Sequence, residues 1–367
     1  MRVTFFSESD RGACHRYRVA LPVQALNEQR GITARFSMQW NAGVANDDVY
    51  VFHRNHLKEA IQLLHRLTLE GRVAVYDIDD NVFHIPESNP VFNLYMNSPS
   101  IPWNQVISMR YASAISVSSS GLRQAYAPLN DKIRVIPNCI SVSECVDVSP
   151  VFDTGKILVF WGGSPTHKQD LEILKYVVPA VRKRHGDKVE FVIMGEPDAE
   201  FPVPVLHVPF GSYGFFQRVM RSCHIGLAPM ADNAFNRGKS DLRIKELASM
   251  RLPVVASPVG DYNIPDLNMM HCAEPRDWVE AISELIDSRA RRRELSDASW
   301  EWVQQWDISN HVHLWVELIE ELTNVRKRRD PGEVVKVQGG KRAQPSVGSD
   351  RVTVVKPTNT RDRYVRR

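Results

Sequence analysis

The segment from Lys239 to Glu246 places a cation, small polar residues and a carboxylate within eight residues. It follows a strand-like segment, and its sequence predicts a helix with Ser240 as the N-cap. The first N–H groups of a helix carry partial positive charge and bind anions, and Lys239 adds a full charge beside them. Asp241 is expected to point away from such an anion. Glu246, further along, could accept two hydrogen bonds from adjacent sugar hydroxyls.

Two earlier loops carry residues of similar chemistry. Gly162 and Gly163 follow a strand and let the backbone approach a ligand closely, and Lys168 lies where the next helix starts and can meet a phosphate. Their spacing matches neither the dinucleotide-binding glycine pattern nor the ATP-binding P-loop. We expect the chemistry of this half of the chain in the loops that follow its strands, namely 162–168, 195–198 and 236–240.

An acidic cluster closes a strand in the first half of the chain. If the strand continues, Asp77 and Asp79 share one face, and Asp80 follows. Such carboxylates could bind a cation, orient acceptor hydroxyls or accept a proton. The structural alternative is that they cap the turn before Val82.

Strand-like and helix-like segments alternate along the chain. Strands are predicted at 3–6, 48–52, 73–77, 114–117, 133–136, 157–160, 189–194, 205–208, 225–228 and 252–256, with helices between them, among them 19–29, 57–69, 103–112 and 121–127. This alternation is typical of parallel sheets with crossover helices. The sequence therefore predicts an α/β fold of two Rossmann-like, doubly wound domains, 1–145 and 156–325, joined by a linker, 146–155.

Composition indicates a soluble, cytoplasmic chain, with peripheral binding at a membrane left open. No run of 18 apolar residues occurs, and the first ten residues read as a strand rather than as a signal peptide. The five cysteines are scattered without a CxxC pair, which favours reduced thiols over a disulfide framework or a zinc site.

The last 42 residues, 326–367, form a separate basic tail. They contain 13 Lys or Arg and 4 Asp or Glu, a net charge of +9, whereas the preceding residues carry a net charge of −6. The tail lacks apolar periodicity and is predicted to be disordered. It either stays solvated or binds an anionic surface such as nucleic acid or lipid.

Four stretches together resemble retaining glycosyltransferases of the GT-B fold, especially glycosyltransferase family 4. They are KSDLRIKELASMRLPVVASPVG (239–260), RVIPNCI (134–140), FWGGSPTHK (160–168) and FVIMG (191–195). The resemblance implies two domains facing across a cleft and a nucleotide-diphosphate sugar as donor, held mainly by the second domain. It implies no cofactor and no metal.

The resemblance also assigns roles to residues. Glu246 matches the second Glu of the family's paired motif, which holds the ribose, and Lys168 matches the lysine beside the diphosphate. Two positions depart from the pattern, because Gly238 replaces the first Glu and Ser164 stands near the expected arginine. Arg237 and Lys239 are hypothesised to supply the missing charge. The expected donor site comprises Gly162, Gly163, Ser164, Lys168, Gly195, Arg237, Gly238, Lys239, Ser240, Asp241, Leu242 and Glu246, and the expected acceptor side comprises Gly12, His15, Arg16, Asp77, Asp79 and Asp80.

The reaction implied is metal-free, retaining transfer of a sugar to an acceptor hydroxyl. The acceptor is expected to be a glycan or a lipid-linked sugar, with DNA left open by the basic tail. Two alternatives remain. One is a metal-dependent phosphohydrolase that uses Asp77 and Asp79, because DIDDN resembles the nucleophile loop of haloacid-dehalogenase enzymes. The other is a sugar-nucleotide-binding module without catalysis.

Overall fold

The computed structural model describes residues 1–40, 47–146, 148–151, 154–195 and 200–328. Residues 1–328 form one compact unit. The predicted tail therefore lies almost wholly outside the described residues. Among the described residues, no helix is long and apolar enough to cross a bilayer.

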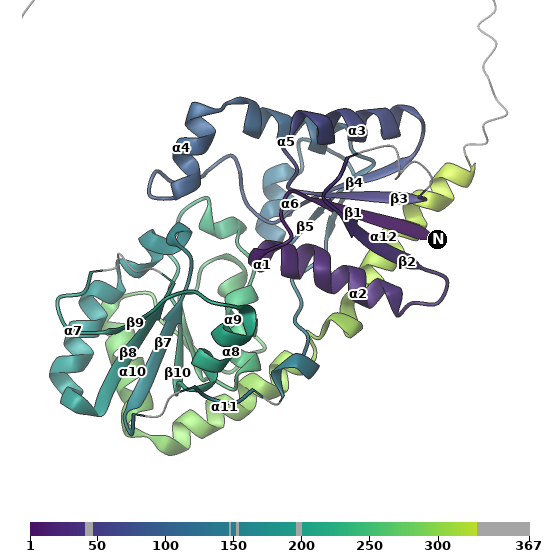
Figure 1. The fold of residues 1–367 in the computed structure, drawn as a ribbon. Coiled ribbons are helices and arrows are strands. Elements are labelled where there is room, and N and C mark those ends of the chain that lie inside the picture. The colour runs from purple at the N-terminus through teal and green to yellow at the C-terminus, as the bar shows by residue number, and fades with distance from the viewer. Residues whose placement is uncertain (41–46, 147, 152–153, 196–199, 329–367) are drawn as a thin grey trace, which may run out of the picture. The chain divides into compact units, whose positions relative to one another are not determined.

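The first sheet is parallel and has the strand order β2-β1-β3-β4-β5-β6 (Figure 1). Its central strands read as unbroken buried runs, as expected when helices cover both faces. Helices α3, α5 and α6 pack on one face, and α2 packs on the other. The elements are β1 (Arg2–Ser7), α2 (Leu21–Asn27), β2 (Thr33–Ser37), β3 (Val49–His53), α3 (Lys58–Leu69), β4 (Val73–Ile78), α4 (Pro90–Asn97), α5 (Ser100–Tyr111), β5 (Ala114–Val117), α6 (Ser120–Tyr126) and β6 (Ile133–Val135).

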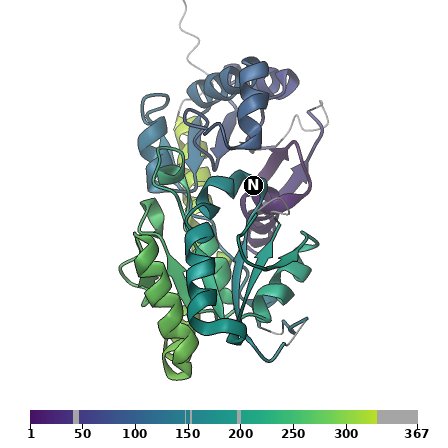
Figure 2. The same cartoon turned by 90° about the vertical axis from the view of Figure 1, so that its left-hand side faces the viewer.

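The second sheet is also parallel, with the order β12-β11-β10-β7-β8-β9. Helices α8, α9 and α11 cover one face, and α7 and α10 cover the other (Figure 2). The elements are β7 (Ile157–Gly162), α7 (Leu174–His185), β8 (Val189–Met194), β9 (Leu206–Val208), α8 (Tyr213–Arg221), β10 (Ile225–Ala228), α9 (Leu242–Ser249), β11 (Val254–Ala256), β12 (Met270–His271), α10 (Pro275–Asp287) and α11 (Arg289–Gln304).

The last described helix, α12 (Ile308–Arg328), packs against the first sheet although it follows the second along the chain (Figure 1). Its Trp315 is 1% exposed and lies edge-on to Phe5 of β1, with ring centroids 5.2 Å apart. Leu318 and Ile319 complete the contact. The apolar face of α12 thus belongs to the core of the first sheet, while the predicted domain limits group most of this helix with the second domain.

Candidate functional site

The loops after β7 and β8 meet at the carboxyl edge of the second sheet. The Gly163 N–H donates to the Met194 carbonyl at 3.0 Å. Gly195 has a φ of +91°, and a Cβ there would lie 2.7 Å from the Gly163 oxygen. Gly195 is therefore required by its positive φ and by close backbone approach, whereas a Cβ at Gly163 would lie 2.7 Å from the Trp161 ring. Of the predicted loop 195–198, residues 196–198 lie outside the described residues.

Asp170 joins the loop after β7 to the loop after β10. Its Oδ1 accepts from the Ala231 N–H at 2.8 Å and from Asn236 Nδ2 at 2.7 Å, and its Oδ2 lies 2.8 Å from His167 Nδ1. The carboxylate is 3% exposed. Three loops that are distant in sequence thus converge at one edge, as the parallel topology requires.

Helix α9 begins at Leu242, so the prediction that Ser240 is its N-cap is wrong. Asp241 occupies the cap position, and no side chain caps the helix. The Ser240 Oγ instead accepts from Asn138 Nδ2 at 2.9 Å. Asp241 is turned along the helix, where its Oδ1 lies 2.7 Å from Lys245 Nζ. Burial raises the pKa of Asp241, and the adjacent Lys245 charge opposes that shift.

Glu246 lies on α9 with its carboxylate 6% exposed. Its Oε1 accepts from the Tyr17 hydroxyl at 2.7 Å, and its Oε2 lies 3.1 Å from Arg243 Nη1. Tyr213 is close, with its hydroxyl 3.1 Å from that of Tyr17. The carboxylate is thus fixed by one residue of its own helix and one that follows β1. Each carboxylate oxygen can accept a further hydrogen bond.

Residues of the first sheet's carboxyl edge contact the segment 234–238. The Ser119 hydroxyl donates to the Gly238 carbonyl at 2.6 Å, and Asn81 Nδ2 donates to the Ala234 carbonyl at 3.2 Å. Gly121 of α6 packs so closely that a Cβ would lie 2.0 Å from the Arg237 carbonyl oxygen. This segment is therefore held by the first domain as well as by the second.

Side chains of the first domain lie beside Gly238, in the space that a larger residue at this position would need. A Cβ there would lie 3.1 Å from Leu122 Cδ2 and 3.2 Å from Asn81 Cβ. The position where the family pattern has its first Glu is buried in this chain. The departure from the pattern therefore has a local cause, namely the packing of α6 against this turn.

Lys239 is paired with the acidic cluster of the first domain. Its Nζ lies 2.5 Å from Asp80 Oδ1, and Arg54 Nη1 lies 3.0 Å from Asp80 Oδ2 and 3.3 Å from Asp79 Oδ1. Burial would raise the pKa of Asp80, but the Lys239 and Arg54 charges outweigh it and lower that pKa to about 2. The charge hypothesised to replace the missing arginine is thus already neutralised by Asp80.

Asp77 is fully buried and has several partners. Arg18 reaches both of its oxygens, at 2.5 and 3.1 Å, while Ser116 donates to Oδ1 at 2.6 Å and His53 Nδ1 lies 2.8 Å from Oδ2. Burial alone would raise the pKa of Asp77, yet Arg18 and His53 lower it well below the ordinary value. This carboxylate joins β3, β4 and β5 to the chain after β1.

The other predicted acceptor-side residues follow β1: Gly12 and His15 lie in a short α-helix, and Arg16 begins the π-helical turn after it. Gly12 has a φ of +85° and starts this helix, α1 (Gly12–His15). The His15 ring packs edge-on to Phe36, and burial lowers its pKa. Arg16 stacks 3.8 Å above the Tyr213 ring and pairs with Glu144. Arg16 therefore reaches the aromatic group beside Glu246.

Lys168, Ser164 and Arg237 are the more solvent-facing members of the predicted donor set. Lys168 is exposed, and within the described ranges it has no hydrogen-bond or ion-pair partner. Ser164 occupies the N-cap position of the 3-10 turn that carries Lys168 without a side-chain capping bond, and its Oγ lies 2.6 Å from Thr166 Oγ1. Arg237 pairs on the surface with Asp232 at 2.7 Å. Lys168 is thus the predicted cation that remains available to a diphosphate.

Sequence reasoning missed Arg54, Arg243 and Tyr17. Arg54 has a φ of +52°, which is rare for a residue with a side chain and recurs at functional positions. Arg243 is three residues before Glu246, so the helical spacing could have indicated that pair. The Tyr17 contact spans 229 residues of sequence and left no local signal.

One known protein family matches part of the second domain. Residues 155–288 match the family model described as Glycosyl transferases group 1. This range includes the loops after β7, β8 and β10 and the whole of α9. No curated protein sequence matches the chain significantly.

Solved structures share the fold at low sequence identity. Sucrose-phosphate synthase from Thermosynechococcus elongatus has a TM-score of 0.63 and 12% identity, covering 88% of this chain and 99% of that one. Anabaena HepE in complex with UDP and glucose has a TM-score of 0.57 and 13% identity, covering 88% and 100%. A UDP-forming trehalose-phosphate synthase from Burkholderia xenovorans has a TM-score of 0.53 and 13% identity, covering 76% and 74%. Residues 155–288 therefore resemble a group 1 glycosyltransferase domain, and the chain shares the GT-B fold of these solved structures.

Proposed function

We propose that this chain transfers a sugar from a nucleoside-diphosphate sugar to an acceptor hydroxyl, with retention and without a metal. The observation that carries the proposal is the convergence of three loops of the second sheet beside α9, with Glu246 buried and Lys168 exposed. The complexes of HepE with UDP and with UDP-glucose support a uridine nucleotide as the first donor to test.

The residues of the site suggest how the leaving group would be stabilised. Negative charge grows on the departing diphosphate as the glycosidic bond breaks, and preorganised donors at that position lower the barrier. The first N–H groups of α9 and the Lys168 ammonium would act there. Glu246 would accept from the ribose hydroxyls, because its carboxylate is already oriented by Tyr17 and Arg243.

The phosphohydrolase alternative is disfavoured by the surroundings of Asp77. A nucleophilic or metal-binding carboxylate must present an oxygen to its substrate or ion. Asp77 is fully buried, and Arg18, Ser116 and His53 lie within hydrogen-bond distance of its two oxygens. The acceptor classes to be screened are glycans, lipid-linked sugars and DNA.

The test is the release of UDP from UDP-glucose, measured with and without EDTA and with each class of acceptor. The proposal predicts turnover that survives EDTA, a product of the same anomeric configuration as the donor, and loss of turnover in Glu246→Gln. Strict dependence on Mg²⁺ or Mn²⁺, or an inverted product, would contradict it. Binding of UDP-glucose without turnover would instead indicate the non-catalytic module to which the Gly238 departure points.

A further inference from the structure

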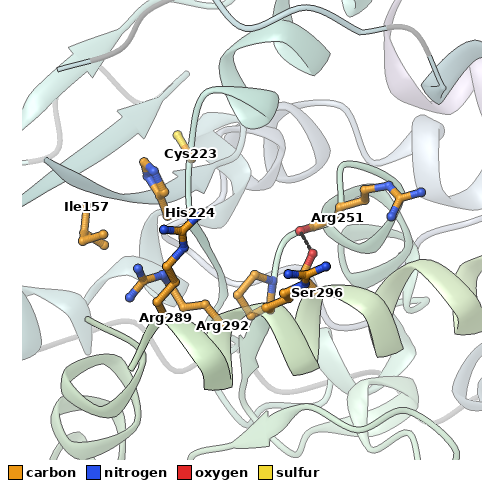
Figure 3. Close-up of a pocket in the computed structure, with 9 residues that line it drawn as sticks. Ile157, Cys223, His224, Arg251, Arg289, Arg292 and Ser296 are labelled. Carbon is orange, nitrogen blue, oxygen red and sulfur yellow. Dashed lines mark hydrogen bonds between the residues drawn. The ribbon is translucent and has the colours of Figure 1, made fainter. Parts of the chain in front are cut away.

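A pocket of about 600 Å³ lies at the amino edge of the second sheet, away from the loops described above (Figure 3). Ile157 at the start of β7, His224 just before β10 and Pro253 just before β11 line one side of it. The first turns of α11 line the other with Arg289, Arg292 and Arg293. The strands are parallel, so this pocket and the proposed donor site lie at opposite ends of the same sheet.

The lining of the pocket contains positively charged side chains but no negatively charged ones. Four of its nine lining residues are arginines, and none of the nine is acidic. The Arg289 and Arg292 side chains lie near His224, whereas the Arg251 side chain points away from them (Figure 3). Arg251 stacks 4.3 Å above the Trp300 ring, and its carbonyl accepts from Ser296 at 2.7 Å.

The arginines stand where helix electrostatics disfavours them. The N-terminus of a helix is its positive end, and cations in its first turn are destabilising. Arg289, Arg292 and Arg293 follow the i, i+3, i+4 spacing that places like charges side by side. The first turn of α11 contains no acidic residue. A sequence that breaks a local rule in this way usually serves a function at that place.

The neighbouring Arg291 differs from the arginines of the pocket because acidic side chains balance its charge. It has two carboxylate partners, Glu284 at 3.3 Å and Glu294 at 2.5 Å. Within the part of the chain that the structure describes, Arg289 and Arg292 have no carboxylate within 4.0 Å. The charges that face the pocket therefore lack the compensation that Arg291 has.

Arg292 is held in place without being neutralised. Its Nη1 donates to the carbonyls of Leu285 and Ile286, the latter at 3.0 Å, at the C-terminal end of α10. Burial, and then the charge of Arg289, lower the pKa of Arg292. Arg293 is more exposed and lies 3.9 Å from Asp297. Arg292 is thus a fixed cation near the N-terminus of α11, and the exposed Arg289 lies one helical turn before it.

We propose that this pocket binds a phosphate-bearing ligand through Arg289 and Arg292. Guanidinium groups match phosphate oxygens with paired N–H donors, and the first N–H groups of α11 add partial positive charge. The His224 ring lines the same pocket, and its Nδ1 accepts from the Leu158 N–H at 3.0 Å.

The experiment titrates inorganic pyrophosphate into the full chain and follows both heat of binding and thermal unfolding. The variant Arg289→Gln is compared with Arg291→Gln, which makes the same charge change two residues further along α11 and outside the pocket. We expect Arg289→Gln to weaken pyrophosphate binding about tenfold and Arg291→Gln to leave it within twofold. Arg289→Gln/Arg292→Gln should abolish the binding of pyrophosphate in this pocket.

Thermal unfolding shows whether weaker pyrophosphate binding comes from the missing arginine or from a misfolded protein. Without pyrophosphate, Arg289→Gln should unfold at the wild-type temperature or above it, because a cation has left the helix N-terminus. Lys168→Ala removes a cation at the opposite edge of the sheet. It should leave pyrophosphate binding in the pocket unchanged, even if the proposed donor site binds no nucleotide sugar. Equal binding by Arg289→Gln and wild type, or an equal loss in Arg289→Gln and Arg291→Gln, would overturn the proposal.

Vesicles distinguish the source of the phosphate. Co-sedimentation with phosphatidic acid vesicles, but not with phosphatidylcholine vesicles, that is lost in Arg289→Gln would assign a lipid headgroup. Pyrophosphate binding without vesicle binding would assign a soluble phosphorylated molecule.

Discussion

The hydroxyl of Tyr17 lies 2.7 Å from Oε1 of Glu246, although 229 residues separate them in the chain. Tyr17 follows β1 of the first sheet, and Glu246 lies on α9 beside the second. Burial and the nearby Glu246 charge raise the pKa of Tyr17 well above its ordinary value, so this phenol stays protonated and donates. The carboxylate proposed to hold the ribose is therefore positioned partly by the first domain.

Replacing Tyr17 with Phe removes this donor and leaves a buried carboxylate with one partner fewer. We expect the free energy of unfolding to fall by about 2 kcal/mol, the usual cost for a hydrogen bond to a charged group. Urea denaturation measures it. Tyr213→Phe, which alters the neighbouring hydroxyl, should cost less. Equal unfolding free energies for wild type and Tyr17→Phe would contradict the contact.

The Lys239–Asp80 pair predicts a specific pH dependence. The folded-state pKa of Asp80 is lowered to about 2, so its charge stabilises the fold fully above the unfolded value of about 4. This contribution is lost as the pH falls from about 4 to about 2. We expect Asp80→Asn to cost about 2 kcal/mol at pH 7 and the cost to shrink below pH 4. Urea denaturation across this range, with the exposed Asp131→Asn as control, tests it, and a pH-independent cost would refute it.

Gly121 tests the close packing of α6 on the Arg237 carbonyl. A Cβ at this position would lie 2.0 Å from a backbone oxygen, so either α6 or the segment 236–238 must move. Gly121→Ala is expected to cost about 1–3 kcal/mol. Gly214→Ala on α8 is the matched control, because its Cβ would meet nothing within 4 Å and should stabilise the helix by about 0.5–1 kcal/mol. Thermal denaturation that ranks the two variants equally would contradict the packing.

Asp77→Asn distinguishes a structural carboxylate from a catalytic one. Removing this charge leaves the Arg18 guanidinium, which is 1% exposed, without its ion-pair partner. We expect destabilisation of about 3–5 kcal/mol by urea unfolding. Asp79→Asn should cost less, because the Asp79 carboxylate is 10% exposed and pairs with Arg54 at the longer distance of 3.3 Å. A fully stable Asp77→Asn protein that lost a metal-dependent phosphatase activity would restore the phosphohydrolase hypothesis.

Much of the fold was predictable because strands buried on both faces leave a strong signal. The strands at 114–117, 189–194 and 225–228 have the predicted bounds, since their apolar runs are flanked by turn residues. The short, partly exposed strand β2 and helix α4, which has no buried residue, were missed. Neither has the apolar periodicity on which the prediction rests.

Only those features of the candidate site that follow from the sheet topology could be predicted from the sequence. Parallel strands bring their following loops to one edge, so the convergence of 162–168 with 236–240 follows from the strand pattern. Which charges neutralise one another depends on contacts between domains. The pairing of Lys239 with Asp80 spans 159 residues, and the Ser240 hydroxyl, predicted to cap the helix, instead accepts from Asn138, 102 residues away.

The most direct test of the donor site is a calorimetric titration with UDP of the wild type, Lys168→Ala and Glu246→Gln, with Lys188→Ala as a control at the other sheet edge. The account predicts that UDP binds the wild type and Lys188→Ala alike and binds both site variants about tenfold more weakly or worse, because each loses a charged contact. UDP binding that is equal in all four proteins, or that is absent from the wild type, would contradict it.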